Sequence, residues 1–81
     1  MNQIRIIGDL RVLKKSGIRN ELRQDGSFLK AGSAIEVGEP EQCFYDHRDL
    51  LALPFVDAEN KVFYILMEDP FIVSDLEPKL H

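Results

Sequence analysis

Tryptophan is absent from this chain of 81 residues, and cysteine occurs once, at Cys43. A single cysteine excludes an intrachain disulfide, on which small secreted domains usually depend, so we expect a reducing, cytoplasmic compartment. No apolar run approaches the roughly 18 residues that a membrane-spanning helix needs. Residues 1–9 lack the charged start and long apolar block of a signal peptide. The sequence therefore predicts a soluble protein that does not enter a membrane.

Motifs for phosphate and metal binding are missing as well. The five glycines are scattered singly, so no glycine-rich loop precedes a helix. A structural zinc ion typically needs about four Cys, His or carboxylate ligands. The chain offers one cysteine and two histidines, His47 and His81. We therefore expect no cofactor and no metal ion.

The residues that are present are sufficient for one hydrophobic core. Hydrophobic residues make up 44% of the chain, and the length predicts a single domain over residues 1–81. No segment keeps the i, i+3, i+4, i+7 spacing of an amphipathic helix. Residues 4–12 instead alternate with period two, which predicts a strand with one buried face and a bend at Gly8.

The remaining segments predict short strands joined by turns, with at most short helical turns. Residues 14–27 are expected to form a long loop that contains an Asp-Gly turn at 24–27. Further elements are expected in the following segments: a strand over 28–37, an irregular stretch with one helical turn over 42–49, a hairpin over 50–67, a short strand over 71–73 and a polar tail over 74–81.

One passage resembles a known fold family. Residues 28–37, with the sequence FLKAGSAIEV, are similar to the F-x-K-G-x-x-x-x-V passage of SH3-like barrels, where a diverging turn leads into a strand. The resemblance implies an all-β fold, a small barrel or rolled sheet of about five strands, and it transfers no function. Peptide-binding SH3 domains hold proline-rich ligands with a line of exposed aromatic residues. Because this chain has only Tyr45 and Tyr64 as tyrosines, we do not expect it to recognise such ligands.

Cys43 and His47 are the one pair with the composition of a nucleophilic site. They lie four residues apart, and Asp46 and Asp49 are close by in the sequence. An imidazole that activates a thiol can make it a nucleophile. The alternative is a buried, inert cysteine next to a surface histidine. Because no set of nucleophile, base and orienting residue converges, we expect no catalytic activity.

Charge is divided unevenly along the chain. Residues 1–30 carry seven Lys and Arg against three Asp and Glu, whereas residues 31–81 carry three against eleven. The basic residues of the predicted loop suggest a site for an anionic partner such as a nucleic acid, the alternative being a solvated loop. They are Lys14, Lys15, Arg19 and Arg23. Binding of nucleic acid is not favoured, because the pI is about 5.0 and Phe28 is the only nearby aromatic residue.

The acidic half suggests a second surface. Phe44 and Tyr45 lie in the predicted irregular stretch, between carboxylates on both sides. An aromatic pair surrounded by carboxylates can dock on a basic partner protein. The alternative is that these residues form an ordinary solvated surface with no binding role.

The predicted hairpin carries the strongest functional expectation. A four-residue loop over 57–60 would pair Val56 with Lys61 and leave both faces of the hairpin apolar. The outer face would then present Leu50, Ala52, Pro54, Phe63, Ile65 and Met67.

Large apolar patches are rarely exposed on monomers, so this face is expected to be covered, either by other parts of the chain or by a second copy. The sequence thus predicts a homodimer, and a small non-enzymatic domain that binds itself or another protein. Two alternatives stay open: a nucleic-acid-binding module that uses the basic loop, and a small-molecule site at a subunit interface.

Overall fold

Eight strands make up the secondary structure of the computed structural model, which describes residues 2–74 and has no helix in that range. The strands are β1 (Asn2–Ile6), β2 (Leu10–Lys15), β3 (Leu22–Leu29), β4 (Ala34–Val37), β5 (Glu41–Tyr45), β6 (Arg48–Val56), β7 (Val62–Leu66) and β8 (Ile72–Ser74). The prediction of an all-β fold is confirmed, but the predicted number of about five strands is too low. No helix that could cross a membrane occurs among these residues.

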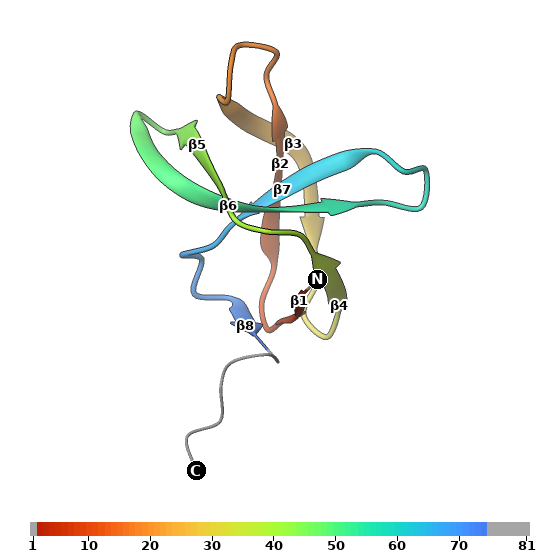
Figure 1. Ribbon diagram of the computed structural model, residues 1–81. Helices are drawn as coiled ribbons and strands as arrows, with labels where there is room; N and C mark the ends of the chain where they lie inside the picture. Colours follow the sequence, from red (N-terminus) through yellow and green to blue (C-terminus); the bar gives the residue numbers. More distant parts are fainter. Residues whose placement is uncertain (1, 75–81) are drawn as a thin grey trace.

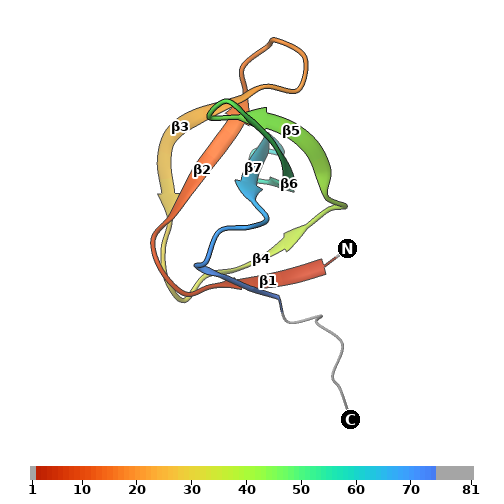
Figure 2. The same ribbon diagram turned by 90° about the vertical axis from the view of Figure 1, so that its left-hand side faces the viewer.

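Two antiparallel sheets are built from these strands (Figure 1). The smaller sheet has the order β4-β1-β8, and the larger has the order β3-β2-β7-β6-β5. The larger sheet curls, so that its edge strands β3 and β5 approach each other (Figure 2). They meet at one parallel bridge between Glu21 and Phe44, and the sheet is not closed into a barrel.

Gly8 marks the point where the chain passes from one sheet to the other. The single strand predicted over residues 4–12 is in fact two strands, β1 in the smaller sheet and β2 in the larger. The ring of Phe71 covers Gly8 so closely that a Cβ atom there would lie 2.6 Å from Phe71 Cδ1. The backbone N–H of the preceding Ile7 donates to the carbonyl oxygen of Phe71, at 2.9 Å. Glycine therefore permits both the bend and the close contact.

Two apolar clusters fill the interior. The first takes residues from both sheets and lies between them: Ile4, Ile6, Leu10, Val37, Leu53 and Ile65. The second lies inside the curl of the larger sheet: Leu13, Leu22, Cys43, Leu50, Ala52 and Tyr64. No charged side chain is buried among the described residues. Hydrophobic burial is therefore the main source of stability, at about 1.5–3 kcal/mol for each large apolar side chain fully removed from water.

The long loop predicted over residues 14–27 is much shorter in the structure. It spans only residues 16–21, because β2 extends to Lys15 and β3 begins at Leu22. The turn predicted at 24–27 lies within β3, where Gly26 has a φ of 99°. The pairing of β2 with β3 shifts there, between Arg11 and Leu13. A glycine of positive φ thus forms a bulge in a continuous strand, not a chain reversal.

Residues 42–49 form a hairpin, so the predicted helical turn is wrong. β5 and β6 pair from Tyr45 with Arg48, which leaves Asp46 and His47 as the two loop residues. Their φ angles are 53° and 64°. Two consecutive positive φ angles are typical of the type I′ turn, whose twist matches that of the two strands.

The hairpin of β6 and β7 forms as predicted, but its register is shifted by one residue. Val56 pairs with Val62, not with Lys61. The loop is closed by Asp57, whose backbone N–H donates to the carbonyl oxygen of Lys61 at 3.0 Å. Its carboxylate oxygen Oδ1 accepts the backbone N–H of Lys61 at 2.9 Å, and Asn60 adopts a φ of 66°. Side chains alternate between the two faces of a strand. A shift of one residue therefore moves each side chain of β7 to the face of the hairpin opposite the one predicted for it.

Candidate functional site

The apolar outer face predicted for the β6–β7 hairpin is not a single surface. Pro54 pairs with Tyr64 and Phe55 pairs with Phe63, so Pro54 and Phe63 lie on opposite faces. Residues 50 and 52 share the face of Pro54, whereas residues 65 and 67 share that of Phe63. Three of the six predicted residues are also buried in the two cores: Leu50, Ala52 and Ile65. The predicted surface is therefore wrong in its composition.

The hairpin does leave an apolar surface at its end, where it extends away from the rest of the sheet (Figure 1). Val56 and Val62 face the same side, and 56% and 51% of their surfaces are exposed. They lie beside a hollow of about 470 Å³, which we call the hairpin groove. It is lined by residues 36–38, Glu41, residues 54–56, Val62 and Tyr64.

Pro54 fixes the floor of the hairpin groove. Its carbonyl oxygen accepts the backbone N–H of Gly38 at 2.8 Å, so this carbonyl group points away from β7. The pairing with β5 ends at Ala52, which leaves this side of β6 without a ladder partner from Leu53 on. A proline, which has no N–H to donate, fits such a position at the edge of a sheet.

A tyrosine and two charged residues meet at the inner end of the groove. The hydroxyl of Tyr64 donates to Oε1 of Glu41 at 3.4 Å, and Lys15 Nζ lies 3.9 Å from that same oxygen. Lys15 Nζ is also 5.2 Å from the centroid of the Tyr64 ring, a cation–π distance. Burial, followed by the nearby charge of Glu41, raises the pKa of Tyr64. Tyr64 therefore stays a neutral donor at physiological pH.

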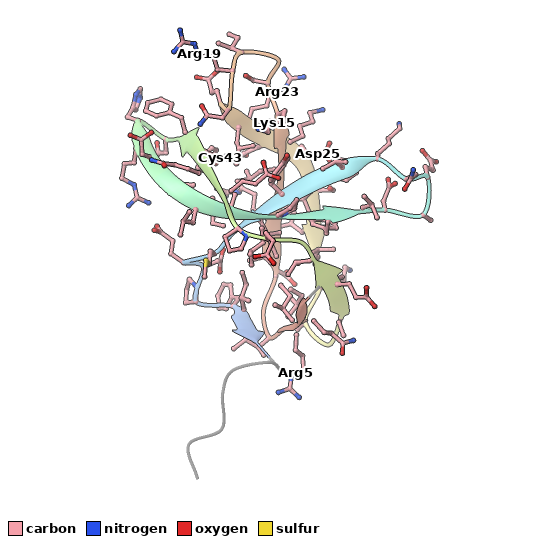
Figure 3. All side chains as sticks on the ribbon, viewed as in Figure 1. Arg5, Lys15, Arg19, Arg23, Asp25 and Cys43 are labelled. Atoms are coloured by element: carbon pink, nitrogen blue, oxygen red, sulfur yellow. The ribbon has the colours of Figure 1, made fainter. Side chains whose placement is uncertain are left out.

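The basic residues predicted to form one anion site are distributed over different surfaces. Arg19 and Arg23 lie at the end of the molecule formed by the 16–21 loop, and Arg5 lies at the opposite end (Figure 3). Lys14 Nζ is 3.4 Å from the carboxylate of Asp25, while Lys15 contacts Glu41 on the other face of β2. Two of the four predicted residues thus have acidic partners, so the structure does not gather them into one cationic site. Binding of nucleic acid stays an alternative that the sequence does not favour.

Phe44 and Tyr45 do not form a docking pair. They are neighbours on β5 and so point to opposite faces of the strand. Phe44 lies beside Ile18 in a shallow hollow, and its backbone N–H donates to the carbonyl oxygen of Asn20 at 3.0 Å. Tyr45 is half-buried on the other face, where its hydroxyl oxygen accepts Nε2 of Gln24 at 3.2 Å.

Cys43 and His47 have different surroundings. Cys43 is fully buried in the second apolar cluster (its position on β5 is shown in Figure 3), and burial raises the pKa of its thiol. His47 is exposed in the β5–β6 turn. A thiol with a raised pKa is a poor nucleophile, since the thiolate is the reactive form. Among the residues that the structure describes, no three His, Cys, Asp or Glu residues gather as metal ligands.

A second hollow shares no lining residue with the hairpin groove, and no pattern in the sequence indicates it. Its volume is about 250 Å³, and we call it the aromatic pocket. The residues that line it come from four separate segments of the chain: Asp9, Arg11, Leu13, Phe28, Tyr45, Leu66, Asp69 and Phe71. Only the curl of the larger sheet brings these segments together, which explains why local spacing does not reveal them.

Comparison of the chain with protein-family models, with curated proteins and with solved structures gives no match.

Proposed function

We propose that the protein is a small, non-enzymatic protein-interaction domain that associates with a second copy of itself through the hairpin groove. The observation that supports this proposal is the pair of exposed valines, Val56 and Val62, beside a hollow of about 470 Å³ at the end of a projecting hairpin. Burying the exposed halves of both valines would contribute roughly 1.5 kcal/mol per protomer.

The position of the hairpin favours a contact between like surfaces. The two strands have no further ladder partner at their outer end, and one face carries β-branched apolar side chains from both. A two-fold axis through this face would place each Val62 against the partner's copy of the same patch, as in an isologous interface.

The charges around the groove fit the same arrangement. Lys61 lies at the outer end of the hairpin and forms an ion pair with Glu59. Both side chains are exposed, so this pair contributes little to stability. Glu36 and Glu41 both line the groove. When two hairpins pack antiparallel about a two-fold axis, the Lys61 of each copy approaches the acidic lining of the other groove. This complementarity distinguishes a second copy from an uncharged partner.

Light scattering coupled to size exclusion tests the proposal on the unmodified protein at micromolar concentrations. A mass of twice 9.3 kDa is expected. The variant Val62→Asp should be monomeric, because it places a carboxylate in the apolar contact of a groove that Glu36 and Glu41 also line. Ile18→Asp is the matched control, since Ile18 is 66% exposed in a loop remote from the hairpin. A monomeric unmodified protein, or monomers with both variants, would contradict the proposal.

A charge exchange tests the orientation of the two copies. Lys61→Glu and Glu36→Lys should each weaken the dimer, and the two together should restore it, because each copy again offers one charge of each sign. Dissociation constants from sedimentation equilibrium measure the effect. Additive weakening in the double variant would show that these residues do not meet.

Two further features belong to this proposal. We propose that the chain is a divergent relative of the SH3-like fold, which is supported by the order of its elements: a strand, a long hairpin, the 28–37 passage into β4, the three strands β5, β6 and β7 joined by two hairpins, and a short last strand. We also propose a cytoplasmic location, which is supported by the single cysteine and its free, buried thiol.

A further inference from the structure

Three aromatic rings from distant parts of the sequence line the aromatic pocket. Phe28 comes from β3, Tyr45 from the end of β5 and Phe71 from the segment before β8. Their surroundings are apolar at the bottom, where Leu13 is buried and Leu66 is half-buried. An aromatic ring presents negative potential on its face, so a pocket with several rings favours a positively charged group.

Each of the three rings is fixed by a contact of its own. Tyr45 accepts a hydrogen bond from Gln24 at 3.2 Å. Phe71 packs on Gly8, and its backbone N–H donates to Oδ1 of Asp69 at 2.9 Å. The guanidinium carbon of Arg11 lies 6.0 Å from the centroid of the Phe28 ring. Tyr45 and Phe71 are thus held in place, which lowers the cost of ordering these two side chains when a ligand binds.

The charges at the rim are mainly negative. Asp9 is exposed and has no hydrogen bond or ion pair among the described residues. Asp69 is half-buried, and of its two carboxylate oxygens only Oδ1 accepts a hydrogen bond from the described residues. Against these two carboxylates stands one cation, Arg11, which already lies over an aromatic face. A ligand that enters the pocket therefore meets three aromatic rings and two carboxylates with acceptor capacity.

We propose that the aromatic pocket binds a compact organic cation, an alkylated ammonium or a guanidinium head group. The volume of about 250 Å³ admits a head group of this size and is below the range of about 300–1,000 Å³ of typical drug-sized sites. The same chemistry occurs in a free small molecule and in a methylated lysine side chain of a protein. Arg11 acts as an internal competitor, since its guanidinium covers the face of Phe28. This site is separate from the hairpin groove and does not depend on the proposed self-association.

A titration followed by amide chemical shifts tests the proposal with choline as the probe. Its neutral isostere, 3,3-dimethylbutan-1-ol, has the same shape without the charge. We expect choline to shift the amides around Phe28, Tyr45 and Phe71, and to bind roughly two- to fivefold more tightly than the isostere, which is the range of an exposed cation–π contact. Equal affinities, or shifts elsewhere on the molecule, would overturn the proposal.

Variants locate the site. Phe28→Leu and Phe71→Leu should each weaken choline binding by a similar factor, and Phe28→Leu is the safer of the two because Phe28 is more than half exposed. Arg11→Gln should strengthen binding, since it removes the competing cation. Phe44→Leu, on the other side of β5, is the matched control and should have no effect. Binding that survives Phe28→Leu unchanged would refute the assignment.

A final arm distinguishes the two sources of the head group. A short peptide with trimethyllysine is titrated beside the same peptide with unmodified lysine. Preference for the methylated peptide over choline would identify a protein partner, and preference for choline a free small molecule. Failure of both probes to bind would overturn the proposal without bearing on self-association, which is measured by mass.

Discussion

Replacement of Gly8 by alanine tests whether the contact with Phe71 governs the passage between the two sheets. The new Cβ atom would lie 2.6 Å from Cδ1, 2.8 Å from Cγ and 2.9 Å from Cε1 of the Phe71 ring. Such distances require a shift, and Cγ is the ring atom that can move least. The Phe71 backbone is also held by hydrogen bonds to Ile7 and Asp69.

Two effects of opposite sign compete in this variant. An alanine reduces the conformational freedom of the unfolded chain, which stabilises a protein by about 0.4–1 kcal/mol where the backbone conformation is compatible. The φ of Gly8 is not in the left-handed region, so this gain applies. Overpacking typically costs about 1–3 kcal/mol. The expected net result is a loss of roughly 0.5–2 kcal/mol, or several degrees in Tm for a domain of this size.

A double-mutant cycle with Phe71→Ala separates the two effects. Without the ring, Gly8→Ala should become neutral or stabilising by up to about 1 kcal/mol, which corresponds to a coupling free energy of about 1–3 kcal/mol. Urea denaturation of the four proteins, followed by circular dichroism, gives the free energies of unfolding. If Gly8→Ala destabilises both backgrounds equally, the ring contact is not the reason for the glycine.

Other parts of the structure give further expected outcomes. The free energy of unfolding should fall as the pH rises above about 9, because burial raises the pKa of Cys43 above its ordinary 9.0 and that of Tyr64 above its ordinary 10.0. The unfolded chain then loses these protons first, at a limiting slope of about 1.4 kcal/mol per pH unit and group. Urea titrations at several pH values measure the slope. Cys43→Ala should remove the part of the decrease that begins at the lower pH, which is due to Cys43. Ile65→Ala should lower the free energy of unfolding by about 2–5 kcal/mol, since Ile65 is fully buried between the sheets. A loss below about 1 kcal/mol would show that Ile65 is not part of a packed core. Asp57→Ala should cost about 1–2 kcal/mol, because one carboxylate oxygen accepts two backbone N–H groups of the loop; thermal melts should show it. His47→Gly should instead raise Tm by relieving a positive φ, a gain of about 0.5–1 kcal/mol, and an unchanged or lower Tm would show that the turn is not strained.

The sequence predicted the fold class correctly because strand patterns are local. Period-two alternation and short turns suffice to indicate strands without helices. The bend at Gly8 was predicted, but the passage to a second sheet was missed because alternation continues across the glycine. The β5–β6 turn was missed because Asp46 and His47 are not a common type I′ pair.

The register of the β6–β7 hairpin shows where local patterns fail. Both strands are apolar on both faces, so alternation does not fix the pairing, and the loop decides it. Asp57 closes a five-residue loop by accepting backbone N–H groups farther along the chain, with Asn60 at a positive φ. Asp and Asn at these positions are a recognisable turn signal. The aromatic pocket had no such signal, because its residues meet only when the sheet curls.

The pairing of β1 with β8 has a consequence for the time course of folding. Residues 4–6 lie beside residues 72–74, so the smaller sheet joins segments from opposite ends of the described chain. A growing chain on a ribosome can pair β1 with β4 early, but β1 cannot pair with β8 until residues 72–74 have emerged. Until then one edge of β1 presents unpaired backbone groups, which are a template for pairing with other chains. Non-local contacts of this kind also slow folding, to the range of milliseconds to seconds in β proteins. The nascent protein is therefore exposed to aggregation for longer than a helical chain of equal length.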